Sequence, residues 1–256
     1  MKLAILTDIH GCSIALDAVM QDIESRGGVD GYVFLGDYCA IGSDPAGVLE
    51  RITKLSNARF VRGNTDCYST SSNRPSPHLS DVLKNPTLAT TYAEVSASFA
   101  WTQGMVTAAG WFDWLANLPL EERLTLPDGT KVLFVHATPG NDDGRGLAAV
   151  DDEEWVREAF VNSCEETLIF VGHVHIPHER RIDGKHLVNP GSVGNPAGKD
   201  IRAHYVILDA DTSGYEVIRY DVKYDIEAVM GHIQAMHHPT APYLLHFYRG
   251  EHEPEL

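Results

Sequence analysis

Apolar segments rich in β-branched residues alternate along the first half of the chain with segments that have helical periodicity. Residues 13–26 and 45–55 place their apolar side chains at the spacing of amphipathic helices. Five apolar segments predict buried strands at residues 3–7, 32–35, 59–62, 131–135 and 168–171. Alternation of this kind predicts an α/β fold in which the first strands are parallel neighbours joined by crossover helices.

The second half of the chain carries turn signals that are typical of antiparallel pairs. Pro127-Asp128-Gly129-Thr130 predicts a turn between two strands, and Ile182-Asp183-Gly184-Lys185 predicts a hairpin. Further strands are expected at residues 204–209 and 215–220, followed by a closing helix at 226–236. The second half is therefore expected to be more antiparallel than the first.

Residues 68–118 interrupt this alternation. A loop rich in Ser, Asn and Pro at 69–77 leads into helical patterns at 88–101 and 106–118. We interpret residues 68–118 as a helical cap inserted into a single domain that spans residues 1–256. Four large aromatic residues of the segment are expected to form the cap's own core rather than a platform for stacking bases: Trp101, Trp111, Phe112 and Trp114.

Composition narrows the class of protein and its partners. The chain has 43% hydrophobic residues but no apolar run near the ~18 residues that a membrane span requires, so no membrane association is expected. The apolar segment at the N-terminus is too short for a secretory signal, which predicts a cytoplasmic location. The formal net charge of −16 disfavours binding of long nucleic acids. A nuclease, which needs a basic track beside its site, is correspondingly disfavoured.

Four cysteines are present, without a C-x-x-C pair or the spacing of a zinc knuckle. We expect reduced thiols. Cys12, Cys39 and Cys67 each follow a polar block by two or three residues, and small side chains packing in tight turns explain them better than a redox or ligand role.

A potential metal ligand follows each of the five predicted strands. Because ligands of open α/β sheets collect beyond the carboxyl ends of the strands, these residues are expected to converge on one site. The blocks are Asp8-x-His10, Gly36-Asp37, Gly63-Asn64, His136 and Gly172-His173-x-His175. In an extended segment, residues i and i+2 face the same side and lie about 6.5–7 Å apart. Asp8 with His10, and His173 with His175, can therefore each serve one site. Carboxylate, imidazole and amide ligands suit Mn, Fe, Co, Ni or Zn better than calcium.

In this order and spacing, the five blocks resemble the calcineurin-like metallophosphoesterase family, and they extend over residues 8–175. Asn189-Pro190-Gly191-Ser192-Val193 also resembles a tail motif of the bacterial and archaeal phosphodiesterase-like branch. The resemblance implies a four-layer α/β sandwich, with two mixed β-sheets flanked by helices. It also implies two divalent metal ions.

Carried over position by position, the resemblance assigns four ligands to each ion, with Asp37 as the bridging carboxylate. The first ion would be held by Asp8, His10, Asp37 and His175, and the second by Asp37, Asn64, His136 and His173. The resemblance thus implies a phosphoesterase that hydrolyses phosphodiester or phosphomonoester bonds of a small phosphorylated substrate. A pair of divalent ions lowers the pKa of bound water towards ~7, so a metal-bridging hydroxide is the expected nucleophile, with Asp37, Asn64 and His136 as catalytic residues.

One residue departs from the family pattern. The family usually has His after the Asn of the third block, where it assists the departing oxygen, whereas this chain has Thr65. Threonine has no useful proton affinity near neutral pH, so the general acid is open among His78, His178, Asp66 and no residue at all. We expect good leaving groups to tolerate this change best.

Arg62 and Arg74 are candidates for holding phosphate oxygens, although an ordinary ion pair is the better explanation for Arg62. Within the family, a dinucleoside polyphosphate hydrolase or a protein phosphatase is an alternative function. A non-catalytic metal-binding scaffold protein is an alternative of a different class, and the presence of all seven ligands argues against it.

Overall fold

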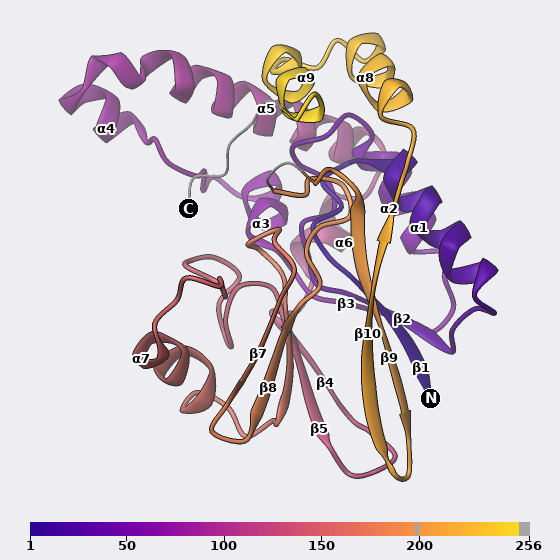
Figure 1. The fold of residues 1–256 in the computed structure, drawn as a ribbon. Coiled ribbons are helices and arrows are strands. Elements are labelled where there is room, and N and C mark those ends of the chain that lie inside the picture. Colours follow the sequence, from indigo (N-terminus) through magenta and orange to yellow (C-terminus); the bar gives the residue numbers. More distant parts are fainter. Residues whose placement is uncertain (198–199, 251–256) are drawn as a thin grey trace.

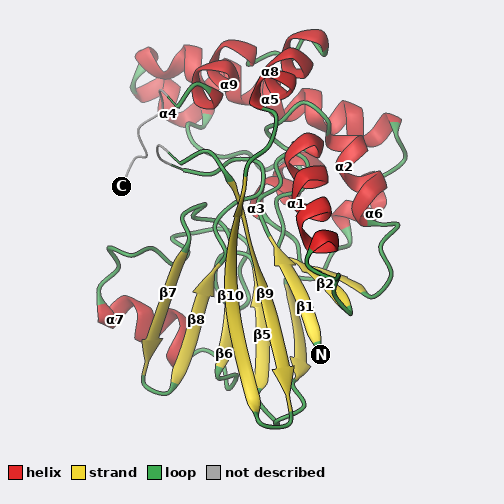
Figure 2. Ribbon diagram, turned by 45° about the vertical axis from the view of Figure 1, so that its right-hand side comes forward, coloured by secondary structure: helices red, strands yellow, loops and turns green. Residues whose placement is uncertain are grey.

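The computed structural model describes residues 1–197 and 200–250, and it contains two mixed β-sheets (Figures 1 and 2). The first sheet has the strand order β10-β9-β1-β2-β3. Its strands are β1 (Lys2–Leu6), β2 (Gly31–Phe34), β3 (Ala58–Phe60), β9 (Ala203–Asp211) and β10 (Gly214–Val222). β1, β2 and β3 are parallel, whereas β9 is antiparallel to both β1 and β10. The antiparallel half is thus supplied by the end of the chain, as predicted.

The second sheet has the strand order β4-β5-β6-β8-β7. Its strands are β4 (Glu121–Thr125), β5 (Lys131–Val135), β6 (Leu168–Val171), β7 (His178–Ile182) and β8 (Lys185–Asn189). Both predicted turns are confirmed, because β4 pairs with β5 and β7 pairs with β8 in antiparallel register. β5, β6 and β8 are parallel neighbours in the centre of this sheet.

Alternating side chains place these sheets in four layers. Leu3 and Ile5 of β1 point into a core shared with the second sheet, whereas Ala4 and Leu6 point towards helices. In β5, Val132 and Phe134 face the first sheet, and the residues between and after them face a third core. The predicted α/β sandwich of two mixed sheets flanked by helices is confirmed.

Helices cover the outer face of the first sheet (Figure 2). The two crossover helices are α1 (Ser13–Ser25) and α2 (Pro45–Ile52). α2 starts where expected because the Asp44 side chain accepts a hydrogen bond from the amide of Gly47 and Pro45 occupies the first turn. α8 (Ile226–Ala235) and α9 (Ala241–Tyr248) add Val229, Ile233, Leu244 and Phe247 to the same core. α9 was not predicted.

The outer face of the second sheet is covered by a shorter helical segment. It consists of α7 (Glu153–Val156) and the continuing π-helical turn η2 (Arg157–Val161). Val156 and Phe160 pack on Leu133 and Val171 of the sheet. Among the described residues, no helix is both long and apolar enough to cross a membrane.

The segment at residues 68–118 differs in detail from the expected cap. Its elements are the end of α3 (Asn64–Thr70), α4 (Leu79–Lys84), the 3₁₀ turn η1 (Pro86–Leu88), α5 (Ala89–Ala108) and α6 (Phe112–Ala116). α4 and α5 extend away from the sheets as an arm (Figure 1). α5 is one continuous helix, not two, because Gly104 lies on its open side and costs only about 1 kcal/mol there.

The aromatic residues of this segment do not form a separate core, so that prediction was wrong. Trp111, Phe112 and Trp114 pack against the helix-covered core of the first sheet, and the Trp114 ring meets Phe60 edge-on at 5.2 Å. Trp101 instead packs on the imidazole of His238, with 4.6 Å between the two ring centroids. The short loop after α5 brings α6 back to the sheet edge, where these rings cover β3.

Candidate metal centre

All seven predicted ligands lie at or just beyond the carboxyl ends of β1, β2, β3, β5 and β6. Asp8 follows β1, Asp37 follows β2, His136 follows β5, and His173 follows β6. The third strand ends at Phe60, two residues earlier than expected, and Asn64 is the first residue of α3. Because both sheets direct these ends to the same edge, residues more than 160 positions apart meet there.

The ligand loops have an unusual backbone conformation. Five residues are in the left-handed region, with φ between 49° and 72°: Asp8, His10, Asp37, His173 and His175. The prediction that Asp8 with His10, and His173 with His175, lie in extended segments was therefore wrong, because a left-handed residue turns the chain. Each such residue costs about 1–3 kcal/mol unless its surroundings enforce it, and such strain is concentrated at functional sites.

Glycines allow the loops to approach one another closely. A Cβ atom on Gly63 would overlap the carboxylate of Asp37, and one on Gly172 would lie 3.0 Å from Oδ2 of Asp8. Gly36 has φ of +101°, and a Cβ there would lie 2.8 Å from Nδ1 of His136. Gly36, Gly63 and Gly172 thus precede ligands because only glycine leaves room for the neighbouring ligand.

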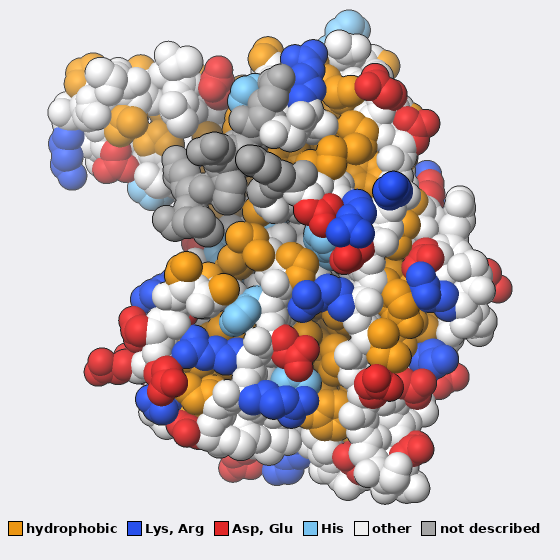
Figure 3. All heavy atoms as spheres, in the orientation of Figure 1, with side chains coloured by type: hydrophobic (Ala, Val, Ile, Leu, Met, Phe, Trp, Pro, Cys, Tyr) orange, Lys and Arg blue, Asp and Glu red, His pale blue; other side chains and the backbone are white. Residues whose placement is uncertain are grey.

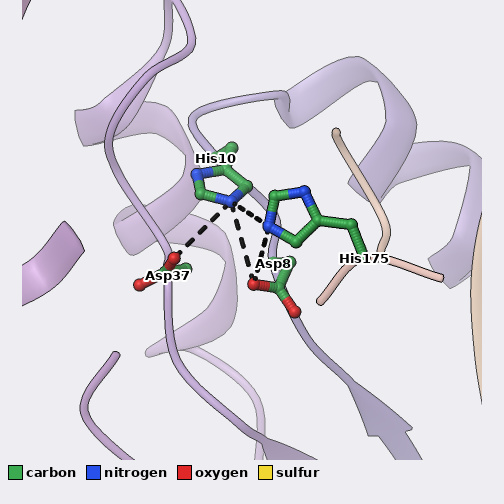
Figure 4. Close-up of side chains that lie close together, drawn as sticks. All are labelled: Asp8, His10, Asp37 and His175. Atoms are coloured by element: carbon green, nitrogen blue, oxygen red, sulfur yellow. Dashed lines mark hydrogen bonds and ion pairs between the residues drawn. The ribbon is translucent and has the colours of Figure 1, made fainter. Parts of the chain in front are cut away.

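Four ligands form a tight cluster, which we call the first half of the site. The ligand atoms of Asp8, His10, Asp37 and His175 all lie within 4.8 Å of one another, and the side chains point inward (Figure 4). Nε2 of His10 lies 3.0 Å from Nε2 of His175 and 3.6 Å from Oδ2 of Asp37. Nε2 of His175 lies 3.2 Å from Oδ1 of Asp8.

The remaining three ligands form the second half of the site, on the other side of Asp37. Oδ1 of Asn64 lies 2.9 Å from Nε2 of His136 and 3.1 Å from Nδ1 of His173. Oδ1 of Asp37 lies 3.5 Å from Nε2 of His136, while its Oδ2 faces His10. Asp37 therefore presents one carboxylate oxygen to each half.

Backbone carbonyls orient the imidazole rings. Nδ1 of His136 donates to the carbonyl of Leu35 at 2.7 Å, and Nδ1 of His10 donates to the carbonyl of Ala40. A nitrogen that donates in this way carries the proton, so Nε2 of each ring faces the centre. His173 is turned the other way, because its Nε2 donates to the carbonyl of Gly144 at 2.7 Å and leaves Nδ1 towards Asn64.

The charges of the predicted ligands favour a bound cation. Burial alone would raise the pKa of Asp37, but His136 and His10 outweigh burial and hold this pKa well below its usual range. Oδ1 of Asp8 is buried and has no hydrogen-bond partner, although it lies among imidazole rings. A buried carboxylate oxygen without a partner is costly unless a cation satisfies it. The residues present therefore fit divalent metal ions.

The tail motif at residues 189–193 supports the ligand loops, a role that its spacing did not reveal. The Ser192 hydroxyl donates to the carbonyl of Asp8 at 2.7 Å, and the Asn189 amide donates to the carbonyl of Gly172 at 2.9 Å. The motif therefore ties the loop after β1 to the loop after β6. Both contacts are long-range, so sequence spacing carries no signal for them.

Asp66 has a structural role that argues against it as a general acid. Its two oxygens accept hydrogen bonds from the amides of Asp37, Tyr38 and Gly63, at 2.8–3.0 Å. Burial and the neighbouring Asp37 raise the pKa of Asp66 to about 7. Its place in the fold is to hold the loop of the bridging carboxylate against α3.

The other candidate acids lie in different surroundings. Thr65 donates its amide to Oδ1 of Asp37 at 2.9 Å, and its hydroxyl oxygen is buried without a partner. His78 is exposed at the start of α4, and it lines a cavity of about 710 Å³ that also reaches Asn64. His178 lies on β7, with burial lowering its pKa.

The cavity beside Asn64 is bordered by α3, the loop before α4, and Asp143. Arg74 lines it, but Nη1 of Arg74 donates to the backbone carbonyls of Tyr68, Ser71 and Asn73. Arg74 therefore supports the loop that walls the cavity. Nε of Arg62 forms a 2.6 Å ion pair with Asp142, so the expected ion pair of Arg62 is confirmed.

Solved structures resemble this fold over nearly the whole chain. A metallophosphoesterase from Sphaerobacter thermophilus has a TM-score of 0.74 and 23% identity, with 98% of each chain covered. A hypothetical protein from Pyrococcus horikoshii has a TM-score of 0.77 and 19% identity, with 95% of this chain and 97% of that chain covered. These similarities show the fold.

Sequence comparison gives the family. An uncharacterised protein of Methanocaldococcus jannaschii is 32% identical over 247 residues, which cover 89% of this chain and 91% of that protein. The symmetrical bis(5'-nucleosyl)-tetraphosphatase of Pectobacterium carotovorum is 31% identical over 93 residues, or 34% of this chain and 33% of the enzyme. Residues 1–213 match the model of the calcineurin-like phosphoesterase superfamily domain. With its ligand loops and its double sheet, the chain belongs to the calcineurin-like phosphoesterase superfamily.

Proposed function

We propose that this protein is a dinuclear metal-dependent phosphoesterase that hydrolyses phosphodiester or phosphomonoester bonds of a small phosphorylated molecule. The observation that carries the proposal is the position of Asp37, whose two oxygens face the two halves of the site. In the proposal, each half holds one divalent ion and Asp37 bridges them. Mn, Fe, Ni and Zn suit the mixed carboxylate, imidazole and amide ligands.

When bound, two such ions would lower the pKa of water and neutralise the phosphate oxygens. The chain's own residues provide the geometry for this chemistry. Asp37 fixes the two halves relative to each other, and Asn64 and His136 complete the half that borders the open cavity. Burial of Asp8, Asp37 and His136 removes water that would otherwise screen these charges.

The cavity of about 710 Å³ is the proposed binding place for the rest of the substrate, because it reaches the Asn64 side of the site. Its size suits a small molecule. On the face drawn in Figure 3, basic side chains are interleaved with acidic ones, which does not favour long nucleic acids. We propose a cytoplasmic location for the protein, which the free thiols of Cys12, Cys39, Cys67 and Cys164 support.

A dinucleoside polyphosphate hydrolase is the second candidate function. The 93-residue similarity to the tetraphosphatase favours it, although that match covers about a third of each protein. Phosphoanhydrides also have good leaving groups, which suits a site with Thr65 where the family usually has His. A protein phosphatase has no specific observation in its favour. A non-catalytic scaffold is disfavoured because all seven ligands converge.

Hydrolysis assays on metal-stripped protein reloaded with Mn²⁺, Ni²⁺, Zn²⁺ or Mg²⁺ test the proposal. The substrates are bis-(p-nitrophenyl) phosphate, p-nitrophenyl phosphate, an alkyl phosphate monoester and a dinucleoside tetraphosphate. We expect metal-dependent hydrolysis, with the alkyl monoester slowest. Two bound ions without turnover of any substrate would support the scaffold instead, and equal rates for the alkyl monoester and the activated diester would refute the leaving-group argument.

A further inference from the structure

One loop, residues 141–144, contacts the second half of the site through two neighbouring residues. The carbonyl of Gly144 accepts from Nε2 of His173 at 2.7 Å, and the carboxylate of Asp143 accepts a hydrogen bond from the phenol of Tyr68. Asp142 fixes the loop by its ion pair with Arg62. The described contacts of this loop thus reach the Asn64 side of the site.

Tyr68 connects the loop to a ligand. It lies one helical turn after Asn64 in α3, so the two side chains share a face of the helix. Asn64, Tyr68 and Asp143 also line the same cavity. The amide oxygen of Asn64 faces His136 and His173, at 2.9 and 3.1 Å, so its amide nitrogen points away from these two rings.

We propose that Tyr68 and Asp143 are positioning residues for the second metal ion, and that they hold the Asn64 amide with its oxygen towards that ion. This inference rests on the proposed dinuclear site. Asp143 accepts from the phenol, so the phenol oxygen is free to accept from the Asn64 nitrogen. Without this chain, the amide can rotate by 180° and present its NH₂ group, which cannot bind a cation.

The aromatic ring and the hydroxyl of Tyr68 have separable roles. The ring packs edge-on against Phe99 at 5.6 Å, within a small core that includes Ala40. Phenylalanine at position 68 keeps this packing and removes only the hydroxyl. Asp143 is exposed, so its replacement also leaves the core intact.

The first half of the site has different supports. Asp8 is held by the Thr7 hydroxyl at 2.7 Å and by the amide of His173 at 3.0 Å, and Nδ1 of His175 lies 3.4 Å from the Asn195 amide. Loss of the Tyr68 hydroxyl should therefore weaken one ion and leave the other in place. Loss of outer hydrogen bonds of this kind weakens metal binding by about 10–100-fold.

The test compares Tyr68→Phe with Tyr205→Phe in the full-length protein. Tyr205 is a matched control, because its hydroxyl also donates to a carboxylate, that of Asp22 at 2.7 Å, but neither residue belongs to the site. The readouts are Mn²⁺ titration calorimetry and electron paramagnetic resonance, which distinguishes a coupled Mn²⁺ pair from a single ion. We expect Tyr68→Phe to bind the second ion about 10–100-fold more weakly, and Tyr205→Phe to bind both normally.

Two further variants separate positioning from general destabilisation. Asp143→Ala should reproduce the Tyr68→Phe defect, whereas Asp143→Asn retains an acceptor oxygen and should restore most of the binding. Normal affinity for both ions in Tyr68→Phe, or equal weakening of both, would overturn the inference. If the unmodified protein binds two ions but hydrolyses nothing, only the proposed function fails. If the unmodified protein binds a single ion, both the proposed dinuclear function and this inference fail.

Discussion

The two halves of the proposed metal centre are built differently. The first half draws on the loops that follow β1, β2 and β6, and its ligand atoms form one tight cluster. The second half combines the start of a helix, the end of a strand and a loop residue, and the loop at 143 and 144 contacts it through Tyr68 and His173. The comparison teaches that side chains outside the ligand set support both halves, but from different parts of the chain. Thr7 and Asn195 contact the first half, and the loop at residues 141–144 contacts the second.

Removal of the shared residue should have the largest effect, because it breaks both halves. Asp37→Asn takes away the charge that faces His10 and His136. We expect the loss of several kcal/mol of transition-state stabilisation, so kcat/KM should fall by about 10³–10⁵-fold, with both ions bound weakly. Asp128→Asn, in an exposed turn, is the control for loss of one carboxylate. A mutant that keeps both ions and its activity would refute the bridging role.

Single histidine variants should separate the halves. His175→Ala removes a ligand of the first half only, and His173→Ala removes one of the second half only. Each variant should retain one ion and lose about 2–4 kcal/mol of transition-state stabilisation, which is about 30–1000-fold in kcat. Elemental analysis of bound metal with parallel kinetics measures this. If either variant lost both ions, the halves would not be independent sites.

Chelation should lower thermal stability by a measurable but smaller amount. A ligand present at 100 times its Kd stabilises the folded chain by about 2.7 kcal/mol. For a chain of this size, that corresponds to a Tm lower by about 5–10 °C in chelator, restored by added Mn²⁺. Differential scanning calorimetry measures the shift, and His175→Ala should show about half of it. An unchanged Tm in chelator would argue against tightly bound metal ions.

The smallest expected effect is proton release on metal binding. Burial alone would lower the pKa of His136, but Asp37 outweighs burial and raises this pKa to about 10; Asp8 raises the pKa of His175 in the same way. Below its raised pKa, each ring keeps a second proton in the ion-free protein, and a metal ion must displace it. Affinity should therefore rise with pH up to about 10.

Calorimetry in buffers of different ionisation enthalpy measures the released protons. We expect the ion of the second half to release about one proton at pH 8, because the pKa of His136 is raised to about 10. The raised pKa of His175 should add proton release from the first half as the pH is lowered. His10 and His173 have lowered pKa values, because burial disfavours their charged forms, so they contribute little. Metal binding that is independent of both pH and buffer would contradict this description of the site.

Much of the fold could be predicted because it depends on local pattern. Alternating apolar runs and turn residues predicted the strands, and β5 and β6 have the predicted bounds. The convergence of Asp8, Asp37 and His136 was predicted from strand ends. The left-handed backbone of Asp8 and His10 was not, because Asp and His tolerate several conformations and only the close packing of loops selects this one.

The supporting contacts could not be predicted from the sequence. Tyr68 and Asp143 are 75 positions apart, and neither residue type signals a partner at that separation. The same holds for Ser192, which reaches the carbonyl of Asp8 across 184 positions. The packing of Trp111, Phe112 and Trp114 was misjudged for a related reason. They were assigned to their own segment, whereas they pack against the core of the first sheet, with Trp114 on Phe60.

The left-handed residues of the proposed site also bear on how its ion preference could be engineered. Close contacts with neighbouring glycines accompany the left-handed backbone of Asp8 and Asp37. Exchange of a ligand side chain leaves this backbone arrangement in place, whereas a change in Gly36 or Gly63 would meet neighbouring residues of the site. Engineering a new ion preference should therefore start from the side chains and leave the glycines untouched.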